Sequence, residues 1–494
     1  MNAPNQKWPP EAPRSLPARH DRLIRSDQER SKIADSLPLR VVTPIFGGGP
    51  VPRKVDRVEV IRAASIRGHL RFWWRALHAQ NYSDSKSLYK AETELWGGPT
   101  TSDRGGRSPV ELRVDLIKRP TDDKIDRNNP KAPGEHATGY ALFPAREEKE
   151  DKKKNKPYKP PGERYQSDVD FKLTISAPAD KATQVCDALR AWLLFGGYGG
   201  RTRRGLGSLT ITGVRAREQW LPKGATKEAI KQIFGRDIFA VPAPGTFVPV
   251  LAGAELFDNS PASSAEIAWT TAIAWLRDFR QGSEGPDAAR ERSSDRFRPG
   301  RSRWPEADKV RHLSKKSDRL KWAHLPQHNE TPAWPRAVLG LPIIGRFQDK
   351  NRQGKRWQDL EPPMTEPGGF ELGWRDAEGV HRDRLASPLI VKALPLADGK
   401  FAPIALWLAR ADPPGDVVLK ANGDLRVPAA QTAASFDRLH ATGDTPQLTI
   451  LGKHKTLREV FFAWLKAQPR SSPSQSSTPR PNGPGNRTRS GHLR

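Results

Sequence analysis

The chain has 494 residues, a length that suggests two or three domains with their own cores. Lysine and arginine outnumber aspartate and glutamate by 83 to 56, and the net charge of +27 points to phosphate-rich partners. The single cysteine, Cys186, excludes a framework of intrachain disulfides, and no apolar run reaches the roughly 20 residues of a spanning helix. The first residues also lack the apolar core of a signal peptide. We therefore expect a cytoplasmic protein with no membrane partner.

Both ends of the chain have the composition of disordered segments. Residues 1–35 are rich in Pro, Arg and Ser and show no hydrophobic periodicity. Residues 469–494 contain Arg, Ser and Pro but no acidic residue. We expect a basic lead-in and a basic tail around the folded part.

The first structured stretch predicts a strand followed by an amphipathic helix. A strand over 37–45 leads into the glycine triplet Gly47–Gly49, and Ser65 is placed as the N-cap of a helix that reaches Ala79. One stripe of this helix is apolar and predicts its buried face: Ile66, Leu70, Trp73, Trp74 and Leu77. Its flank is basic, and no acidic residue between 61 and 79 neutralises it: Arg67, Arg71 and Arg75.

Alternating residues then predict two strands, over 110–116 and 169–175, separated by an insertion over 118–166 that includes a segment too polar to fold alone. A helix over 180–195 and a strand over 209–211 follow. The order strand, helix, strand, strand, helix, strand is that of a ferredoxin-like domain, here 36–215.

The second half predicts the same unit less clearly, as a domain over 216–468 with an insertion over 283–332. Strands are expected at 337–347, 389–396, 404–408 and 447–451, with helices around Trp269–Leu276 and Leu457–Leu465. The predicted fold class is α+β, with two ferredoxin-like (RRM-like) domains and long insertions.

A glycine- and arginine-rich loop joins the second helix to the last strand of the first domain. Two glycine–hydrophobic–glycine triplets, 197–199 and 205–207, flank the basic run GRTRR. Glycines allow positive φ and close backbone approach, and guanidinium groups match phosphate oxygens in pairs. The loop is interpreted as a polyanion grip, with Tyr198 as a candidate for stacking on a base. A basic hairpin bathed in water is the alternative.

No motif in the sequence indicates a metal site or a nucleotide-hydrolysing engine. His324 and His328 have helical spacing, but Pro326 between them would break the helix. We therefore expect no metal and no cofactor.

RNA cleavage without a metal is the enzymatic alternative. It needs a general base near the 2′-hydroxyl and a cation beside the phosphate. His69, His78 or His20 could be that base. Asp56 could act on an RNA hydroxyl, or serve as a counter-ion to the basic residues around it.

Four sequence blocks occur in a characteristic order: TPIFGGG (43–49), SIRGHLRFWWRAL (65–77), ELWGG (94–98) and GYGGRTRRGLGSL (197–209). Together they resemble the first subunit of Cmr complexes, the type III-B CRISPR effectors of antiviral defence. The last block alone resembles the glycine-rich loop of the RAMP superfamily, and the first two blocks are more specific. The resemblance covers roughly 37–215.

The resemblance implies a non-catalytic RNA-binding subunit with two ferredoxin-like domains. Its partners would be guide RNA, target RNA and other Cmr subunits, and it would help capture target RNA near the 3′ end of the guide. The blocks and the loop supply the candidate RNA-binding residues: Gly47, Gly48, Gly49, Arg67, Arg71, Arg75, Tyr198, Gly199, Arg201, Arg203, Arg204, Gly205 and Gly207. A metal-independent RAMP endoribonuclease that processes guide precursors is the alternative function.

Overall fold

The structure of the chain is a computed structural model. It describes these residues: 32–49, 51–99, 106–129, 137–150, 157–240, 248–292, 300–315, 331–347, 366–367, 369–382, 384–420 and 432–468. Almost all of the predicted lead-in, the whole predicted tail, and His20, His324 and His328 lie outside the described residues.

The first sheet confirms the ferredoxin-like topology predicted for the first domain. Its antiparallel strands run in the order β3-β6-β1-β7, the order in which the second, third, first and fourth strands of that fold lie. The bounds of these strands are β1 (Lys32–Val41), β3 (Glu111–Lys118), β6 (Val169–Pro178) and β7 (Leu209–Ile211). Strict in–out alternation along β6, with Phe171 and Leu173 buried, leaves one face of the sheet for the helices.

Two helices cover that face, α2 (Ala63–His78) and α5 (Ala182–Phe195), and they pack against each other. The predicted apolar stripe of α2 is buried along its whole length. The predicted Ser65 cap is wrong, because the helix begins two residues earlier. Arg62 occupies the N-cap position without a side-chain cap, and its backbone N–H donates to the Tyr198 hydroxyl at 2.8 Å.

The second half repeats the strand–helix–strand–strand–helix order. Its sheet runs β12-β13-β8, from the strands β8 (Val250–Asp258), β12 (Leu389–Pro395) and β13 (Phe401–Ala409). Its helices are α8 (Ala265–Gln281) and α10 (Leu457–Ala467). Among the described residues no fourth strand pairs with β8, so the ferredoxin-like order stops at its second helix.

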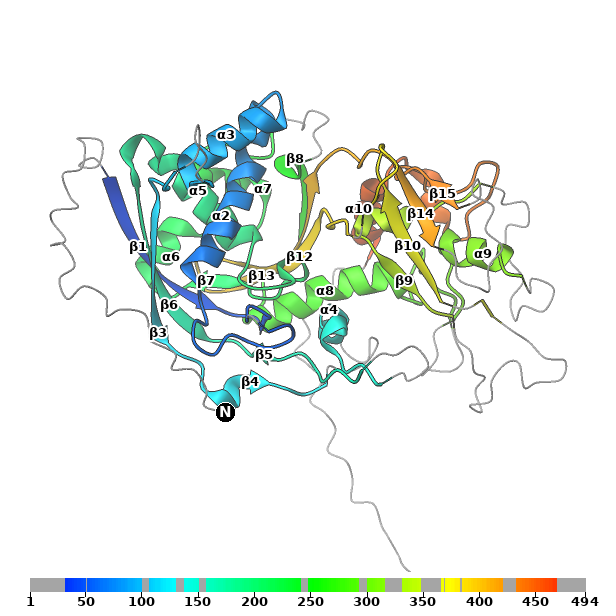
Figure 1. The fold of residues 1–494 in the computed structure, drawn as a ribbon, viewed down its shortest axis with the longest axis horizontal. Helices are drawn as coiled ribbons and strands as arrows, with labels where there is room; N and C mark the ends of the chain where they lie inside the picture. Colours follow the sequence, from blue (N-terminus) through cyan, green and yellow to red (C-terminus); the bar gives the residue numbers. More distant parts are fainter. Residues whose placement is uncertain are drawn as a thin grey trace, which may run out of the picture.

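The middle sheet is buried on both faces. Even-numbered residues such as Ile390 and Leu394 of β12 join the core of α2 and α5, while the odd-numbered Leu389 and Val391 join the core of α8 and α10. Figure 1 shows the resulting layers, with the first sheet, the helices α2 and α5, the middle sheet, and then α8. All seven positions of β12 and all nine of β13 are buried.

Two further small sheets pack around this layered core, and one of them includes strands of the insertion after β3. A five-stranded sheet beyond α8 contains β9 (Ile343–Gly345), β10 (Phe370–Arg375), β11 (His381–Arg382), β14 (Asp416–Lys420) and β15 (Ala433–Ala434), near α9 (Pro305–His312). The strands predicted at 389–396 and 404–408 and the last helix are confirmed. The strand predicted at 447–451 is wrong, since Thr449–Lys453 is a 3-10 turn. The strand predicted at 337–347 is confirmed only over Ile343–Gly345, because the 3-10 turn Pro335–Leu339 occupies its first residues.

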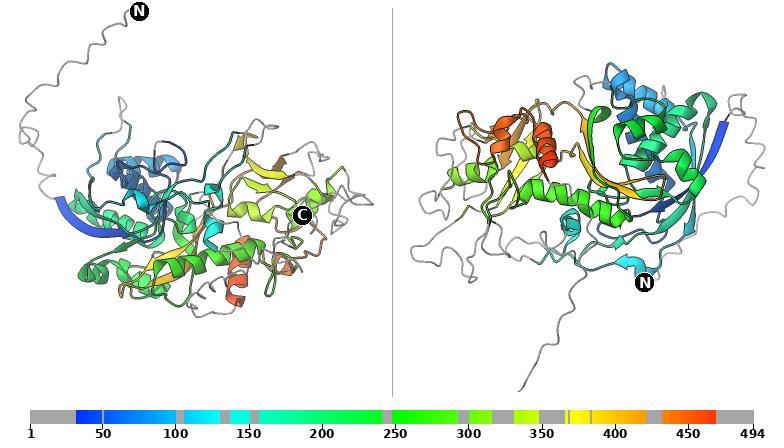
Figure 2. Two further views of the ribbon diagram at one scale, coloured as in Figure 1. Left: turned by 90° about the horizontal axis from the view of Figure 1, so that it is seen from below. Right: turned by 180° about the vertical axis from the view of Figure 1, so that it is seen from behind.

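The polar insertion after β3 is folded where the structure describes it. It contributes β4 (Ile125–Asp126), α4 (Ala137–Ala141) and β5 (Arg164–Tyr165), and β5 pairs with β2 (Ile45–Phe46). Arg53 holds this segment by donating to backbone oxygens of Pro144, Arg146 and Pro160 at 2.5–3.1 Å. Helix α4 packs on α8 of the second half, and Figure 2 shows them side by side. The insertion is stabilised by its neighbours rather than by a core of its own.

The remaining helices are α3 (Ser85–Trp96), α6 (Val214–Trp220) and α7 (Lys227–Phe234). Within the described residues, every helix is too short or too polar to cross a lipid bilayer.

Gly205 is predicted to tolerate no side chain. Its φ is +79°, and an added Cβ would lie 2.7 Å from the indole Nε1 of Trp269 in α8. Gly205→Ala should therefore lower the free energy of unfolding by about 2–4 kcal/mol. The control is Gly68→Ala on the exposed side of α2, where nothing lies within 4 Å and the change should stabilise by up to ~1 kcal/mol. Denaturant unfolding measures both, and an unchanged Gly205→Ala would contradict the packing described.

Because Lys392 is buried, we expect the free energy of unfolding to rise with pH. The Lys392 ammonium group is fully buried and donates to the Gly196 and Leu193 carbonyls at the end of α5, at 2.7 and 3.3 Å. Burial lowers its pKa to about 7. Between that value and the pKa of the unfolded chain, the folded state loses its proton while the unfolded state keeps it, so stability increases as pH rises.

We expect the wild type to gain on the order of 4 kcal/mol relative to Lys392→Met between pH 7 and pH 10. Urea unfolding of both proteins at several pH values isolates this residue, because other titrating groups are common to the pair. A difference that stays constant over this range would show that Lys392 keeps its proton.

Candidate nucleic-acid interface

The structure brings two of the four sequence blocks together. The segment Thr43–Phe46 runs beside the glycine-rich loop, and four hydrogen bonds join them, one of which runs from the Thr43 hydroxyl to the Gly205 carbonyl at 2.7 Å. Gly200 N–H donates to the Phe46 carbonyl at 2.8 Å, Gly207 N–H to the Pro44 carbonyl at 3.0 Å, and Ser208 N–H to the Thr43 hydroxyl at 2.8 Å. The two glycine-rich stretches therefore form a single unit.

Glycine is required in this unit for close packing. Gly207 has a φ of +66°, and an added Cβ would overlap the Tyr198 carbonyl oxygen. At Gly199, with a φ of +88°, it would lie 3.1 Å from the Phe46 carbonyl oxygen. These glycines explain the loop's shape without reference to a ligand.

Two of the predicted RNA-binding arginines point into the protein. Arg203 Nη1 donates to the Ser387 carbonyl, and the Arg204 Nη atoms reach the Leu389 and Leu339 carbonyls at 3.5 Å. Burial lowers the pKa of both arginines to about 10, so both stay charged at neutral pH. The structure gives them a contact with the second half, and their RNA contact stays a prediction.

Tyr198 is also directed inward. Its side chain is buried, its hydroxyl accepts from Arg62 N–H, and its ring lies edge-on to His69 with centroids 6.1 Å apart. Burial raises the pKa of the hydroxyl. No face of the ring is open to a base in this conformation, so base stacking stays a prediction without support from the fold.

The outward part of the unit is smaller than the predicted site. Gly47 and Gly48 form a turn with φ of +72° and +104°, and a Cβ added at either would meet nothing within 4 Å. Arg201 is exposed on the neighbouring loop, where one Nη atom donates to the Ala141 carbonyl at 3.2 Å. Gly49 faces inward, since a Cβ there would lie 2.7 Å from the Lys54 carbonyl oxygen.

The arginine flank of α2 has a partner that the local sequence could not show. Glu92 of α3 accepts from Arg71 Nε at 2.6 Å and from Arg75 Nη1 at 2.5 Å. Arg67 donates both Nη atoms to the Val110 carbonyl at 3.1 Å. One buried carboxylate thus pairs with two arginines, whereas Arg67 is held by a main-chain carbonyl.

A second group of cations lies beside the Gly47–Gly48 turn, and sequence reasoning missed it. The Glu163 carboxylate, which is almost fully buried, lies within 3.1–3.7 Å of Lys54, Arg57 and Arg127, whose side chains are each about half exposed. Hydrogen bonds from Lys54 and Val55 hold its pKa below the usual range despite burial. The carboxylate lies more than a hundred positions from Lys54 in the sequence, and no local signal links them.

The Asp56 carboxylate has other partners than these three cations. It accepts from the N–H groups of Val58 and Glu59 and pairs with Arg62 at 3.3 Å. We define the glycine-turn surface as the outward residues of the glycine-rich unit together with the cations around Glu163: Gly47, Gly48, Lys54, Arg57, Arg127 and Arg201.

The histidines proposed as general bases are engaged in packing. The His69 ring stacks on Trp192 with centroids 6.1 Å apart, and His78 lies against Trp74. Burial lowers the pKa of each to about 4, so both are neutral at pH 7. In the described part of the chain, no three His, Cys, Asp or Glu side chains gather as metal ligands would.

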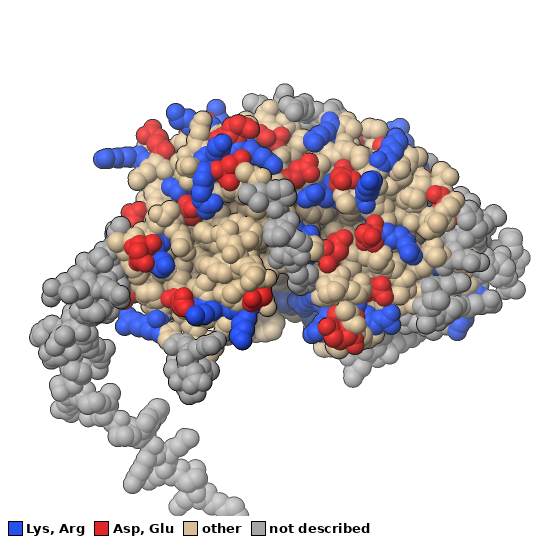
Figure 3. Space-filling view, turned by 90° about the horizontal axis from the view of Figure 1, so that it is seen from above, with Lys and Arg blue, Asp and Glu red and all other residues tan. Residues whose placement is uncertain are grey.

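Net charge does not by itself locate an interface. Figure 3 shows the face seen from above, where lysine and arginine side chains are interspersed with aspartate and glutamate. A polyanion would meet both signs there.

Comparisons with known proteins find a likeness for the first domain. The model of the RAMP superfamily matches residues 38–210. No curated protein matches the chain. Among solved structures, Cmr1 from Pyrococcus furiosus in its apo form is 16% identical, with a TM-score of 0.38 and coverage of 82% of this chain and 94% of that chain. A chain of the type III-B Cmr-beta complex bound to cognate target RNA is 13% identical, with a TM-score of 0.38 and coverage of 77% and 96%.

Cmr6 from Pyrococcus furiosus is 12% identical, with a TM-score of 0.19 and coverage of 37% of this chain and 99% of that chain. Likenesses at this level carry no functional inference, which has to come from residues of this chain.

Glu92 offers a test of the arginine flank. Glu92→Gln leaves two half-buried arginines without a counter-charge and should lower the free energy of unfolding by about 1–3 kcal/mol. The control is Glu94→Gln on the same helix, where an exposed carboxylate lies 4.0 Å from Lys90 and the effect should stay within about 0.5 kcal/mol. Equal effects in thermal or urea unfolding would show that the Glu92 contacts contribute nothing.

Proposed function

We propose that the chain is a non-catalytic RNA-binding subunit of a type III-B CRISPR (Cmr) effector, because residues 38–210 match the model of the RAMP superfamily. In this role it acts in the cytoplasm with guide RNA, target RNA and other Cmr subunits. It helps capture target RNA near the 3′ end of the guide.

The four sequence blocks support the placement in this family, because the fold gives each a defined position. TPIFGGG and the glycine-rich loop form one hydrogen-bonded unit, SIRGHLRFWWRAL forms α2, and ELWGG ends α3 beside it. The blocks thus describe neighbouring elements of one domain, as a shared architecture would require.

The glycine-turn surface is the observation that carries the RNA-binding proposal. Lys54, Arg57 and Arg127 surround the buried carboxylate of Glu163, and the exposed carboxylate of Asp122 lies 3.8 Å from Arg57. Three cations therefore meet two carboxylates, which leaves the group with an excess of positive charge. Next to them the open Gly47–Gly48 turn presents backbone without side chains, so a phosphodiester chain can approach closely.

This arrangement favours contact with phosphates over reading of bases. Half-exposed cations neutralise successive phosphates, which positions a strand but carries no sequence information. In such an effector, base pairing with the guide supplies sequence specificity, while protein contacts follow the backbone.

The endoribonuclease alternative finds less support in the geometry. It needs a histidine beside the scissile phosphate. His69 and His78 are packed against aromatic rings of the core, and neither belongs to the glycine-turn surface. His20 lies outside the described residues.

The test compares binding of labelled single-stranded RNA in EDTA by the wild type and by Lys54→Ala/Arg57→Ala. Each phosphate contact contributes about 0.7 to the slope of log K against log salt. The double variant should bind roughly tenfold more weakly and lose about 1.4 of that slope. RNA should stay intact throughout.

The matched control is Arg113→Ala/Lys181→Ala, which removes two exposed cations elsewhere on the domain and should leave the slope unchanged. Discrete cleavage products that vanish in His69→Ala would instead establish the nuclease. Equal losses in both double variants would show that binding is diffuse and not centred on the glycine-turn surface.

A further inference from the structure

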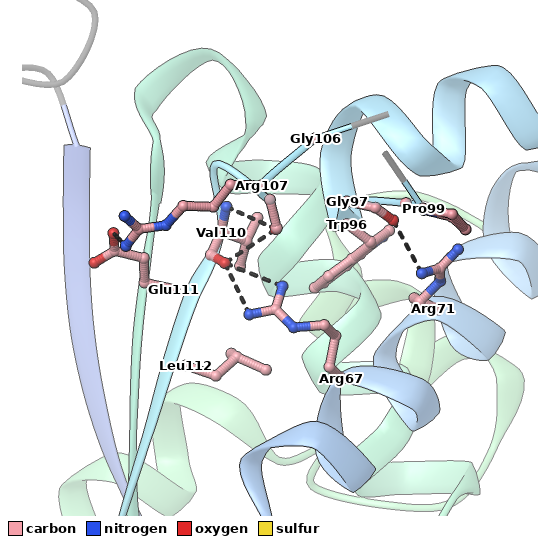
Figure 4. Close-up of a pocket in the computed structure, with 12 residues that line it drawn as sticks. Arg67, Arg71, Trp96, Gly97, Pro99, Gly106, Arg107, Val110, Glu111 and Leu112 are labelled. Atoms are coloured by element: carbon pink, nitrogen blue, oxygen red, sulfur yellow. Dashed lines mark hydrogen bonds and ion pairs between the residues drawn. The ribbon is translucent and has the colours of Figure 1, made fainter. Parts of the chain in front are cut away.

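A cavity of about 640 Å³ lies on the opposite end of β3 from the insertion, between α2, the end of α3 and the start of β3. Its walls combine three arginines with apolar side chains: Arg67, Arg71, Arg107, Trp96, Pro99 and Leu112. Figure 4 shows Arg67 and Arg71 reaching from α2 toward opposite rims of the cavity, with Trp96 between them.

Backbone carbonyls fix the orientation of these guanidinium groups. Arg67 is held by the Val110 carbonyl and Arg71 by the Gly97 carbonyl at 3.0 Å. Both planar forks are therefore pre-organised before any ligand arrives, which reduces the entropy lost on binding.

Positive charge in the cavity is only partly compensated. Among its described lining residues the one acid is Glu111, which already pairs with Arg107 at 2.9 Å. Behind the lining, the buried Glu92 accepts from Arg71 at 2.6 Å but is shared with Arg75, so Arg67 and Arg71 together keep an excess of positive charge. Burial and the neighbouring charge of Arg71 lower the pKa of Arg67, as expected for two cations that face the same space. The Trp96 indole N–H is buried and has no hydrogen-bond partner among the described residues.

The cavity opens where an edge strand begins. β3 is the terminal strand of the first sheet, and no other described strand pairs with its outer edge. Ile117 near the end of this strand is 63% exposed, an unusual position for a large aliphatic side chain on a free edge. Exposed edges are the sites at which an extended segment of another protein can add as a strand.

We propose that this cavity and the outer edge of β3 together dock an extended, carboxylate-bearing segment of a neighbouring subunit. The segment adds along β3, and its Asp or Glu carboxylate enters the cavity between Arg67 and Arg71. The inference rests on the proposed function, since it names the chemistry by which the chain joins its complex.

The surroundings favour a protein segment over RNA. Pro99 and Leu112 offer apolar contacts, and β3 carries the carboxylates of Glu111 and Asp115, which pair with Arg107 and Arg113 at 2.9 Å each. A chain of phosphates along this edge would meet acidic as well as basic side chains. A single carboxylate on an otherwise neutral segment needs charge complementarity only at the arginines.

The first experiment measures co-purification of the other complex subunits with tagged full-length chain. Arg107→Glu lies at the exposed rim, where its side chain is 76% exposed, so this variant should fold normally. Arg107→Glu and Arg67→Glu should each reduce recovery of the complex at least tenfold. The control Lys400→Glu, on an exposed hairpin of the second half, should not. Wild-type recovery with both cavity variants would overturn the proposal.

The second experiment places a photo-crosslinking amino acid at Ile117 in the assembled complex. Crosslinks to an acidic segment of a neighbouring subunit are expected, whereas crosslinks to RNA alone would overturn the proposal and make the cavity an RNA site. Failure of the proposed function looks different, because the wild type itself would then neither bind RNA nor recover the complex. If the wild type binds RNA and recovers the complex, and Arg107→Glu recovers the complex equally well, only the docking surface is rejected.

Discussion

The structure depends on the close approach of three backbone segments around Gly205 and Gly207. The glycine-rich loop lies between the segment 43–46 of its own domain and the second half of the chain. Trp269 of α8 donates its indole N–H to the Arg204 carbonyl at 2.7 Å, and its ring occupies the space that a Cβ on Gly205 would need. A loop that reads from sequence as a grip for phosphate is thus also the joint between the halves.

This contact between the halves explains why several basic side chains are buried. Arg203, Arg204 and Lys392 all donate to main-chain carbonyls across the boundary between the halves. Carbonyl dipoles satisfy a buried cation without adding a negative charge, so the protein keeps its positive balance even where basic residues are internal. A high net charge therefore does not measure how many cations face a ligand. The cations that crowd around Glu163, by contrast, are each about half exposed.

The sequence predicts local features well and long-range partners poorly. The alternation of β6, the apolar stripe of α2 and the order of elements in the first domain are all written in short periodicities, and the structure confirms them. The inward turn of Arg204, the Glu92 contacts of α2 and the cation cluster on Glu163 depend on residues far away in the chain. Neither hydrophobic periodicity nor a sequence motif indicates such long-range pairs. From the sequence alone, every arginine of a basic block is therefore placed on the same exposed face.

The contact between α4 and α8 sets an order of events during synthesis. Ala141 and Leu142, at the end of α4, are buried in the core built around α8, although α4 belongs to an insertion in the first domain. A ribosome releases this apolar turn long before α8 has been made, and domains generally fold as their residues emerge. The first domain must therefore wait, with part of the insertion uncovered, for the second half to arrive. A shortened chain that ends near the domain boundary would keep this surface exposed, and the two halves are better regarded as one folding unit than as two independent modules.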